Sequence, residues 1–89
     1  MVYFTTSGCN VCKALKPKIK QLLSDHFSKV EFIEINAEEH IELSADFSVF
    51  AVPTILIYFN GTEHYRKSRY ISIQEISTLI SRPYHLLFD

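Results

Sequence analysis

The stretch MVYFTTSGCNVCKALKP, residues 1–17, decides the fold. Its apolar, β-prone opening predicts a strand that ends at about residues 6–8. It contains both cysteines of the chain, Cys9 and Cys12, and from residue 10 to about residue 27 apolar residues recur at helical spacing. The stretch therefore predicts a strand, a short loop and a long amphipathic helix that carries the cysteine pair on its first turn.

Two further strands and a short helix are expected in the middle of the chain. Residues 29–36 are rich in Val, Ile and Phe and predict a strand. Asn36 and Glu39 have N-cap and N3 spacing, so a short helix is expected from there to about residue 47. Residues 54–59 are nearly all apolar, which places this strand in the interior of the sheet.

The last part of the chain predicts a hairpin and a helix. Asn60-Gly61 is a strong signal for a tight turn into an antiparallel strand over residues 62–67. Ser72 opens a capping box, so the final helix is expected to begin there and to end before Pro83. Residues 81–89 are apolar but aperiodic and are expected to form a loosely packed tail.

The predicted order is β-α-β-α-β-β-α, an α/β fold. Because the first β-α-β unit pairs strands in parallel and the hairpin adds antiparallel ones, we expect a mixed four-stranded sheet with helices on both faces. The chain of 89 residues is expected to be one domain, with a core over residues 1–80 and the tail over residues 81–89.

Charge and composition narrow the function classes. A net charge of −1 gives no general attraction for nucleic acid or an anionic membrane, and the basic run at residues 66–69 is interpreted as a solvated turn or strand end. The N-terminus lacks the pattern of a signal peptide, and no apolar stretch has the length of a membrane span. We therefore expect a cytoplasmic monomer.

Three interpretations of Cys9 and Cys12 compete. A disulfide between them closes a loop of four residues, for which the chain-entropy stabilisation is only about 2 kcal/mol, so a purely structural staple is the weakest of the three. A structural zinc ion needs four ligands, and the chain has no second C-x-x-C and no closely spaced histidine pair. The histidines are His26, His40, His64 and His85. No metal is therefore expected.

The third interpretation is a redox-active dithiol. A cysteine at a helix N-terminus lies near unpaired backbone amides and the positive end of the helix dipole, which lower its pKa and favour the thiolate. Cys9 is expected there. Cys12 follows one turn later on the same face, close enough to attack a mixed disulfide that Cys9 forms.

With these features on three segments, residues 1 to about 80 resemble the thioredoxin family. The segment SGCNVCKALKP resembles the family's C-x-x-C with a proline five residues beyond, here Pro17. The segment FSVFAVPT is similar to the stretch that ends in the family's cis-proline, and YFNG is similar to its hairpin. The resemblance implies a thioredoxin-like fold and a cis peptide bond before Pro53.

The resemblance also implies which residues contact a substrate. Val52 would present its backbone groups to an extended substrate segment beside Cys9, and Pro53 would face the cysteines and keep metal away from them. Three residues around the cysteines are expected to contribute further contacts: Gly8, Asn10 and Val11.

The chain departs from the family pattern at several positions. Gly8 stands where most members have Trp, and Asn10-Val11 replaces Gly-Pro between the cysteines. Tyr3 falls where thioredoxins carry a buried aspartate, and Glu34 falls where they carry its lysine partner. We expect Glu34 to supply acid-base help to Cys12, with an exposed structural glutamate as the equally open alternative.

The sequence therefore predicts a thiol-disulfide oxidoreductase with Cys9 as nucleophile and Cys12 as resolving cysteine. The resemblance implies protein disulfides as substrates, no cofactor beyond the redox-active disulfide, and a donor such as thioredoxin reductase or glutathione. Two alternatives stay open: a glutathione-dependent, glutaredoxin-like enzyme, and a non-catalytic binding or redox-sensing module.

Overall fold

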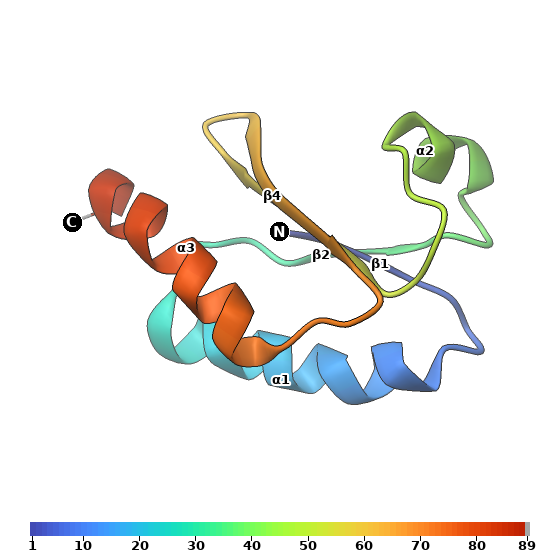
Figure 1. Ribbon diagram of the computed structural model, residues 1–89, viewed down its shortest axis with the longest axis horizontal. Coiled ribbons are helices and arrows are strands. Elements are labelled where there is room, and N and C mark those ends of the chain that lie inside the picture. Colours follow the sequence, from blue (N-terminus) through green and yellow to red (C-terminus); the bar gives the residue numbers. More distant parts are fainter. Residues whose placement is uncertain (89) are drawn as a thin grey trace.

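A four-stranded mixed sheet with strand order β2-β1-β3-β4 forms the centre of the computed structural model, which describes residues 1–88 (Figure 1). The strands are β1 (Val2–Thr5), β2 (Ile33–Asn36), β3 (Thr54–Phe59) and β4 (Thr62–Ser68). β1 pairs in parallel with β2, and β3 pairs antiparallel with both β1 and β4. The predicted mixed sheet is confirmed, with the apolar strand β3 in its interior.

Helices cover both faces of this sheet, as predicted. The long helices α1 (Asn10–His26) and α3 (Ile73–Phe88) pack together on one face, and the short α2 (Ile41–Asp46) lies over the other (Figure 1). Neighbouring residues of β1 point to opposite faces of the sheet, because successive side chains of a strand alternate between the faces. Tyr3 joins the core with α1 and α3, and Phe4 joins the smaller core beneath α2. The two cores are therefore anchored on the same strand.

Strand β2 is shorter than the predicted strand over residues 29–36. In the parallel register Val2 lies opposite Ile33, so residues before Ile33 have no partner on β1. The N-terminal amino group of Met1 instead donates to the carbonyl of Glu31 at 2.8 Å. A strand extends only as far as a neighbouring strand pairs with its backbone hydrogen-bonding groups. Because β1 begins at Val2, β2 begins at its partner Ile33.

Helix α2 begins later than predicted. The Asn36 side chain accepts hydrogen bonds from the amides of Glu38 and Glu39, at 2.9 and 3.3 Å. These bonds close a turn over residues 37–39, so Asn36 caps a turn and the helix starts at Ile41. An asparagine side chain can hold either structure, which explains the misplaced boundary.

Helix α3 is longer than predicted. It continues through Pro83 to Phe88, so both the predicted end before Pro83 and the loose tail over residues 81–89 are wrong. The last residue of that predicted tail, Asp89, lies outside the described residues.

Tyr84 explains why the helix continues past the proline. Its ring is buried and packs edge-on against Phe27, with the ring centroids 5.2 Å apart. Its hydroxyl accepts a hydrogen bond from the backbone amide of Lys29 at 3.3 Å. These contacts with the end of α1 offset the backbone hydrogen bond that a proline removes inside a helix.

The hairpin between β3 and β4 forms as predicted. Asn60 and Gly61 have φ angles of 53° and 76°, the left-handed values that a two-residue primed turn requires. The register brings Ser68 opposite Thr54, after an irregularity between Ile57 and Tyr58. The end of β4 therefore returns to the residue that follows Pro53.

Candidate functional site

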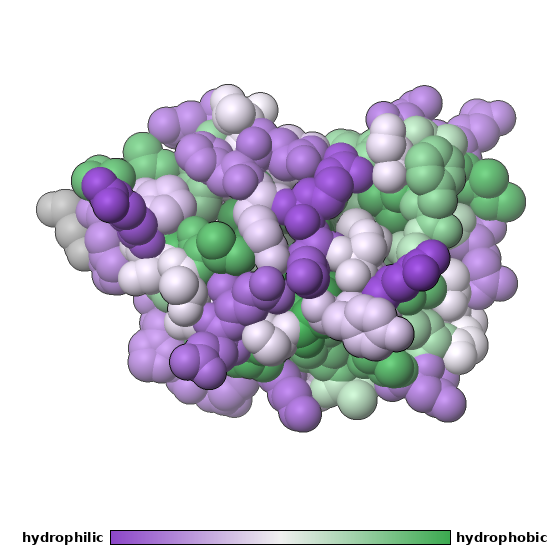
Figure 2. All heavy atoms as spheres, viewed as in Figure 1, coloured by the Kyte–Doolittle hydropathy of each residue, from purple (hydrophilic) through white to green (hydrophobic). Residues whose placement is uncertain are grey.

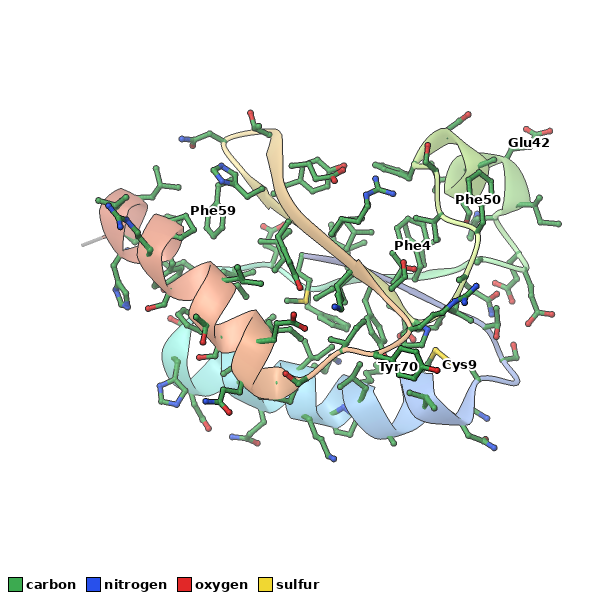
Figure 3. The ribbon with its side chains drawn as sticks, viewed as in Figure 1. Phe4, Cys9, Glu42, Phe50, Phe59 and Tyr70 are labelled. Carbon is green, nitrogen blue, oxygen red and sulfur yellow. A yellow bond between two sulfur atoms is a disulfide. The ribbon has the colours of Figure 1, made fainter. Side chains whose placement is uncertain are left out.

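The two cysteines lie at the start of α1 (Figure 3). They form a disulfide, with their Cα atoms 5.2 Å apart. Cys9 is the N-cap residue of α1, and its sulfur accepts a hydrogen bond from the Cys12 amide at 3.1 Å. Cys12 is only 2% exposed, whereas Cys9 is partly exposed. A reactant that approaches from solvent therefore meets the sulfur of Cys9.

The turn at Val52 and Pro53 packs against the same core as the cysteine pair. The peptide bond between Val52 and Pro53 is cis, as the resemblance implied. Val52 and Cys9 pack against the same core cluster, and Val52 shares a groove with Thr6 of the loop before the cysteines. Hydrogen bonds to Pro53 and Ala51 hold this turn from both sides: the Arg69 amide donates to the Pro53 carbonyl at 2.7 Å, and the Thr54 hydroxyl donates to the Ala51 carbonyl at the same distance.

The surface around Cys9 is open. Gly8, Asn10 and Val11 are all exposed, and Val11 leaves 59% of its side chain in solvent. A Cβ atom built on Gly8 would meet no heavy atom within 4 Å. The position before Cys9 therefore has room for a larger side chain.

Tyr3 contacts Cys12 directly. Its fully buried hydroxyl donates a hydrogen bond of 2.8 Å to the Cys12 carbonyl. Burial, and then the negative charge of Glu34, raise the pKa of Tyr3 to about 12. Tyr3 is therefore a neutral hydrogen-bond donor near pH 7 and cannot take the proton-accepting part of a carboxylate.

Glu34 lies opposite Tyr3, on the neighbouring strand β2. Its carboxylate forms an ion pair with Lys16 and accepts a hydrogen bond from the Thr5 hydroxyl at 3.3 Å. The hydrogen bond from Lys16 lowers the pKa of Glu34, against an opposing desolvation effect. Glu34, Lys16 and Cys12 line one hollow of about 280 Å³. The structure thus brings the predicted acid-base residue to a solvent space that reaches Cys12.

Two exposed aromatic residues of this region were missed at the level of sequence. Phe50, three residues before Pro53, is 82% exposed, and Tyr70, next to Arg69, is 87% exposed (Figure 3). The signal for Tyr70 was available, because the tight Asn60-Gly61 turn fixes a register that returns the chain to Pro53. No comparable signal marks Phe50, since its exposure depends on how α2 packs.

Neither a metal site nor a membrane helix is found in the described part of the chain. Within residues 1–88, no group of three or more His, Cys, Asp or Glu side chains is placed to hold a metal ion. Over the same residues, none of the helices has both the length and the apolar character needed to cross a membrane. The redox group of this site is the disulfide itself.

The chain is similar to thioredoxins in sequence and in structure. A family model described as Thioredoxin matches residues 1–82. The chain is 34% identical to the thioredoxin-like protein YdfQ of Bacillus subtilis, over 96% of this chain and 75% of that protein. It is 32% identical to thioredoxin of Mycoplasma genitalium, over 74% of this chain and 64% of that protein. Thioredoxin 1 from Thermosipho africanus superposes with a TM-score of 0.87 at 31% identity, over 99% of this chain and 97% of that one.

Proposed function

The chain belongs to the thioredoxin family and is a protein-disulfide oxidoreductase, and we propose that Cys9 attacks the substrate disulfide while Cys12 resolves the product. One observation carries this assignment. Cys9 is partly exposed at the N-cap of α1, whereas Cys12 is buried one turn later. In the reduced pair the amide of Cys12 and the positive end of the helix dipole would favour the thiolate at Cys9.

The proposed reaction has two exchanges. The Cys9 thiolate attacks one sulfur of the substrate disulfide, forms a mixed disulfide and releases the other substrate sulfur as a thiolate, which takes a proton from solvent. Cys12 then loses its proton and attacks the sulfur of Cys9. This step restores the Cys9–Cys12 disulfide and releases the second substrate thiol, so two electrons pass from the dithiol to the substrate.

Glu34 is proposed to receive the Cys12 proton. The carboxylate lines the hollow that Cys12 also lines and is unprotonated near pH 7, although the hydrogen bond from Lys16 that lowers its pKa also makes it a weaker proton acceptor. Tyr3, whose hydroxyl bonds to the Cys12 carbonyl, keeps its proton because its pKa is about 12. A comparison of Glu34→Gln with the wild type separates the two interpretations of Glu34. If the rate at which Cys12 attacks the mixed disulfide, and the pH dependence of that rate, stay the same, Glu34 is only a surface ion-pair partner.

The proposed substrate contacts are those around Cys9. Val52 and Pro53 would hold an extended substrate backbone, and Gly8, Asn10 and Val11 would leave the approach to Cys9 open. The exposure of the last three residues and the packing of Val52 and Cys9 against one core cluster support this proposal.

Thioredoxins act on protein disulfides and receive electrons from a reductase, so the proposal includes a thioredoxin reductase as donor and a monomer in the reducing cytoplasm as the working form. The family match does not favour the glutaredoxin-like alternative or the non-catalytic module. Assay with thioredoxin reductase, or with glutathione and its reductase, as the only electron source distinguishes the two donors.

The test of the proposal is a trapping experiment with Cys12→Ser and, as a matched control, Cys9→Ser. We expect reduced Cys12→Ser to accumulate a mixed disulfide through Cys9 with disulfide-bearing substrates such as insulin, and Cys9→Ser to accumulate none. Wild-type protein should accelerate insulin reduction by dithiothreitol. Trapping by Cys9→Ser alone would reverse the assigned roles, and an insulin rate at the dithiothreitol background would exclude catalysis.

A further inference from the structure

Two lysines reach the polar hollow beside Cys12. The hollow has a volume of about 280 Å³, and its charged lining residues are Lys13 and Lys16 of α1 and Glu34 of β2. Hydrophilic side chains project along the lower edge of the molecule, where α1 lies (Figure 2). The helix that carries the cysteines thus also brings positive charge to a solvent space next to the buried Cys12.

Lys16 lies on the same face of α1 as Cys12. The two residues are four positions apart, and side chains at that spacing are neighbours on a helix surface. A long side chain on a helix also leans toward the N-terminus, over the turn that precedes it. The stem of Lys16 therefore leans back toward Cys12, whereas Lys13 leaves the helix about 100° around from Cys12.

Glu34 holds the ammonium group of Lys16 at the hollow. Its carboxylate accepts a hydrogen bond from that group and another from the Thr5 hydroxyl at 3.3 Å. The side chains of Lys16 and Glu34 are 38% and 35% exposed, so the ion pair is open to solvent. A flexible lysine in such a pair can change its partner without a change in the fold.

A thiolate at Cys12 would have few other partners among residues 1–88. Cys12 is 2% exposed, and β3 and α3 contribute only uncharged residues to the core around it. The Tyr3 hydroxyl of β1 already donates to the Cys12 carbonyl. Because an unpaired charge is costly in such surroundings, the lysines of the hollow are the groups that can stabilise the thiolate.

Proton transfer to Glu34 does not by itself favour the thiolate. The hydrogen bond from Lys16 holds the pKa of Glu34 below its ordinary value of 4.5, whereas an ordinary thiol has a pKa of about 8.5. A carboxyl group of that acidity returns the proton readily. Ionisation of Cys12 therefore needs a group that stabilises the thiolate as its proton leaves.

We propose that Lys16 changes its anionic partner in the resolving step: its ammonium group pairs with the Glu34 carboxylate while Cys12 is a thiol, and with the Cys12 thiolate once the proton has passed to Glu34. The net charge of the three groups stays the same throughout. This inference rests on the proposed function, because it needs Cys12 as the resolving cysteine.

The step is balanced in protons and electrons. The Cys12 thiolate attacks the sulfur of Cys9 in the mixed disulfide, forms the bond between the two cysteines and displaces the substrate sulfur as a thiolate. Glu34 then gives its proton to that leaving thiolate through solvent. The carboxylate is restored, and Lys16 pairs with it again.

The test follows the two exchanges one at a time. Reduced protein is mixed in a stopped-flow instrument with dithiobis(nitrobenzoate), a symmetric disulfide that releases a coloured thiolate at each exchange. The first release, by attack of Cys9, depends on the concentration of the probe, whereas the second, by attack of Cys12, does not. The rate of the second release across pH therefore measures the ionisation of Cys12.

The variants separate the charge of Lys16 from its packing. Lys16→Met removes the charge and keeps a long unbranched side chain, and Lys16→Arg keeps the charge. Glu34→Gln removes the carboxylate that competes with the thiolate for Lys16. The matched controls are Lys13→Met, within the same hollow, and Lys20→Met, one turn further along α1.

In Lys16→Met, the midpoint of the pH profile for the second release should rise by about half a unit or more, because the thiolate loses a nearby cation. The second release should slow about twofold at pH 7 and should no longer be slow at alkaline pH, since the scarcer thiolate is also more nucleophilic. Lys16→Arg should keep the wild-type midpoint, and Glu34→Gln should lower it. Lys13→Met and Lys20→Met should move it less than half as far as Lys16→Met.

Three outcomes would overturn the inference. They are an unmoved midpoint in Lys16→Met, an equal shift in Lys13→Met, and a shift in Glu34→Gln that has the same direction as that in Lys16→Met. A wild-type protein that releases only one coloured thiolate would instead overturn the proposed function, because Cys12 would then not resolve the mixed disulfide.

Discussion

The hydroxyl of Tyr3 donates a hydrogen bond to the carbonyl of Cys12 at 2.8 Å, and both residues are buried. This contact fixes the first turn of α1 to β1 directly behind the disulfide. It also occupies the place at which the family carries a carboxylate, so the chain replaces a proton acceptor with a neutral donor. In the proposed reaction the proton of Cys12 therefore leaves by a route other than Tyr3.

Tyr3→Phe tests this division between structure and proton transfer. The variant loses one buried hydrogen bond, so its free energy of unfolding should fall by about 1 kcal/mol. Because the pKa of Tyr3 is about 12, the shape of the pH profile for disulfide reduction below about pH 10 should stay the same. Urea unfolding and insulin reduction across pH measure the two effects, and a changed profile would mean that the hydroxyl does transfer protons.

Gly8→Trp tests the room in front of Cys9. Since a Cβ at Gly8 meets no heavy atom within 4 Å, the variant should keep the wild-type free energy of unfolding to within about 0.5 kcal/mol. The added ring would extend the apolar surface beside Cys9, so the rate of insulin reduction should rise. A loss of stability larger than about 1 kcal/mol would show that Gly8 is needed by the backbone.

The Lys16–Glu34 ion pair makes a small, pH-dependent contribution to stability. The folded-state pKa of Glu34 lies below its ordinary value of 4.5, so the stabilisation is present above that value and is lost as the pH falls through the lower one. Because both side chains are more than one-third exposed, solvent screening limits the effect to about 0.5 kcal/mol. Glu34→Gln should therefore lower the free energy of unfolding slightly at pH 7, and the difference should disappear in acid.

Tyr84→Ala should destabilise the protein strongly. The variant removes a buried ring that packs on Phe27 and a hydroxyl that accepts from the Lys29 amide, so we expect a loss of about 3 kcal/mol. Leu86→Ala, on the same helix but 76% exposed in the wild type, is the control and should change little. Similar effects of the two changes in thermal or urea unfolding would contradict the packing of α3 past Pro83.

Ser44→Ala should stabilise the free protein. It removes a buried hydroxyl that has no hydrogen-bond partner within residues 1–88 and places a better helix former in α2, which together are expected to add about 1 kcal/mol to the free energy of unfolding. Ser24→Ala, at an exposed position of α1, measures the helix-propensity part alone. If the two variants gain equally, the Ser44 hydroxyl already has a satisfactory environment.

The parts of the fold that local sequence controls were predictable. Asn60-Gly61 favours left-handed backbone, and β3 is nearly all apolar, so the hairpin and the inner strand follow from the residues themselves. The errors lie where a distant partner decides. Strand β2 begins only at Ile33, where its pairing with β1 begins, and α3 continues past Pro83 because Tyr84 packs against Phe27.

The candidate site divides in the same way. Cys9, Cys12 and Pro53 are marked by motifs whose residue types the chemistry requires. No motif marks Phe50, because its exposure depends on the placement of α2, and the sequence predicts a start for α2 that is too early. Surfaces formed by the packing of separate elements need the tertiary structure before they can be seen.

The Cys9 sulfur that caps α1 also forms the disulfide with Cys12. The hydrogen bond that this sulfur accepts therefore depends on whether the cysteine pair is oxidised or reduced. The Cys12 amide bonds to a disulfide sulfur in the oxidised protein, and an anionic sulfur accepts such a bond more strongly. The end of the helix would therefore be held more tightly in the reduced state than in the oxidised one. Exchange of this single amide proton with solvent should slow on reduction, which makes it a label-free measure of the redox state of the protein.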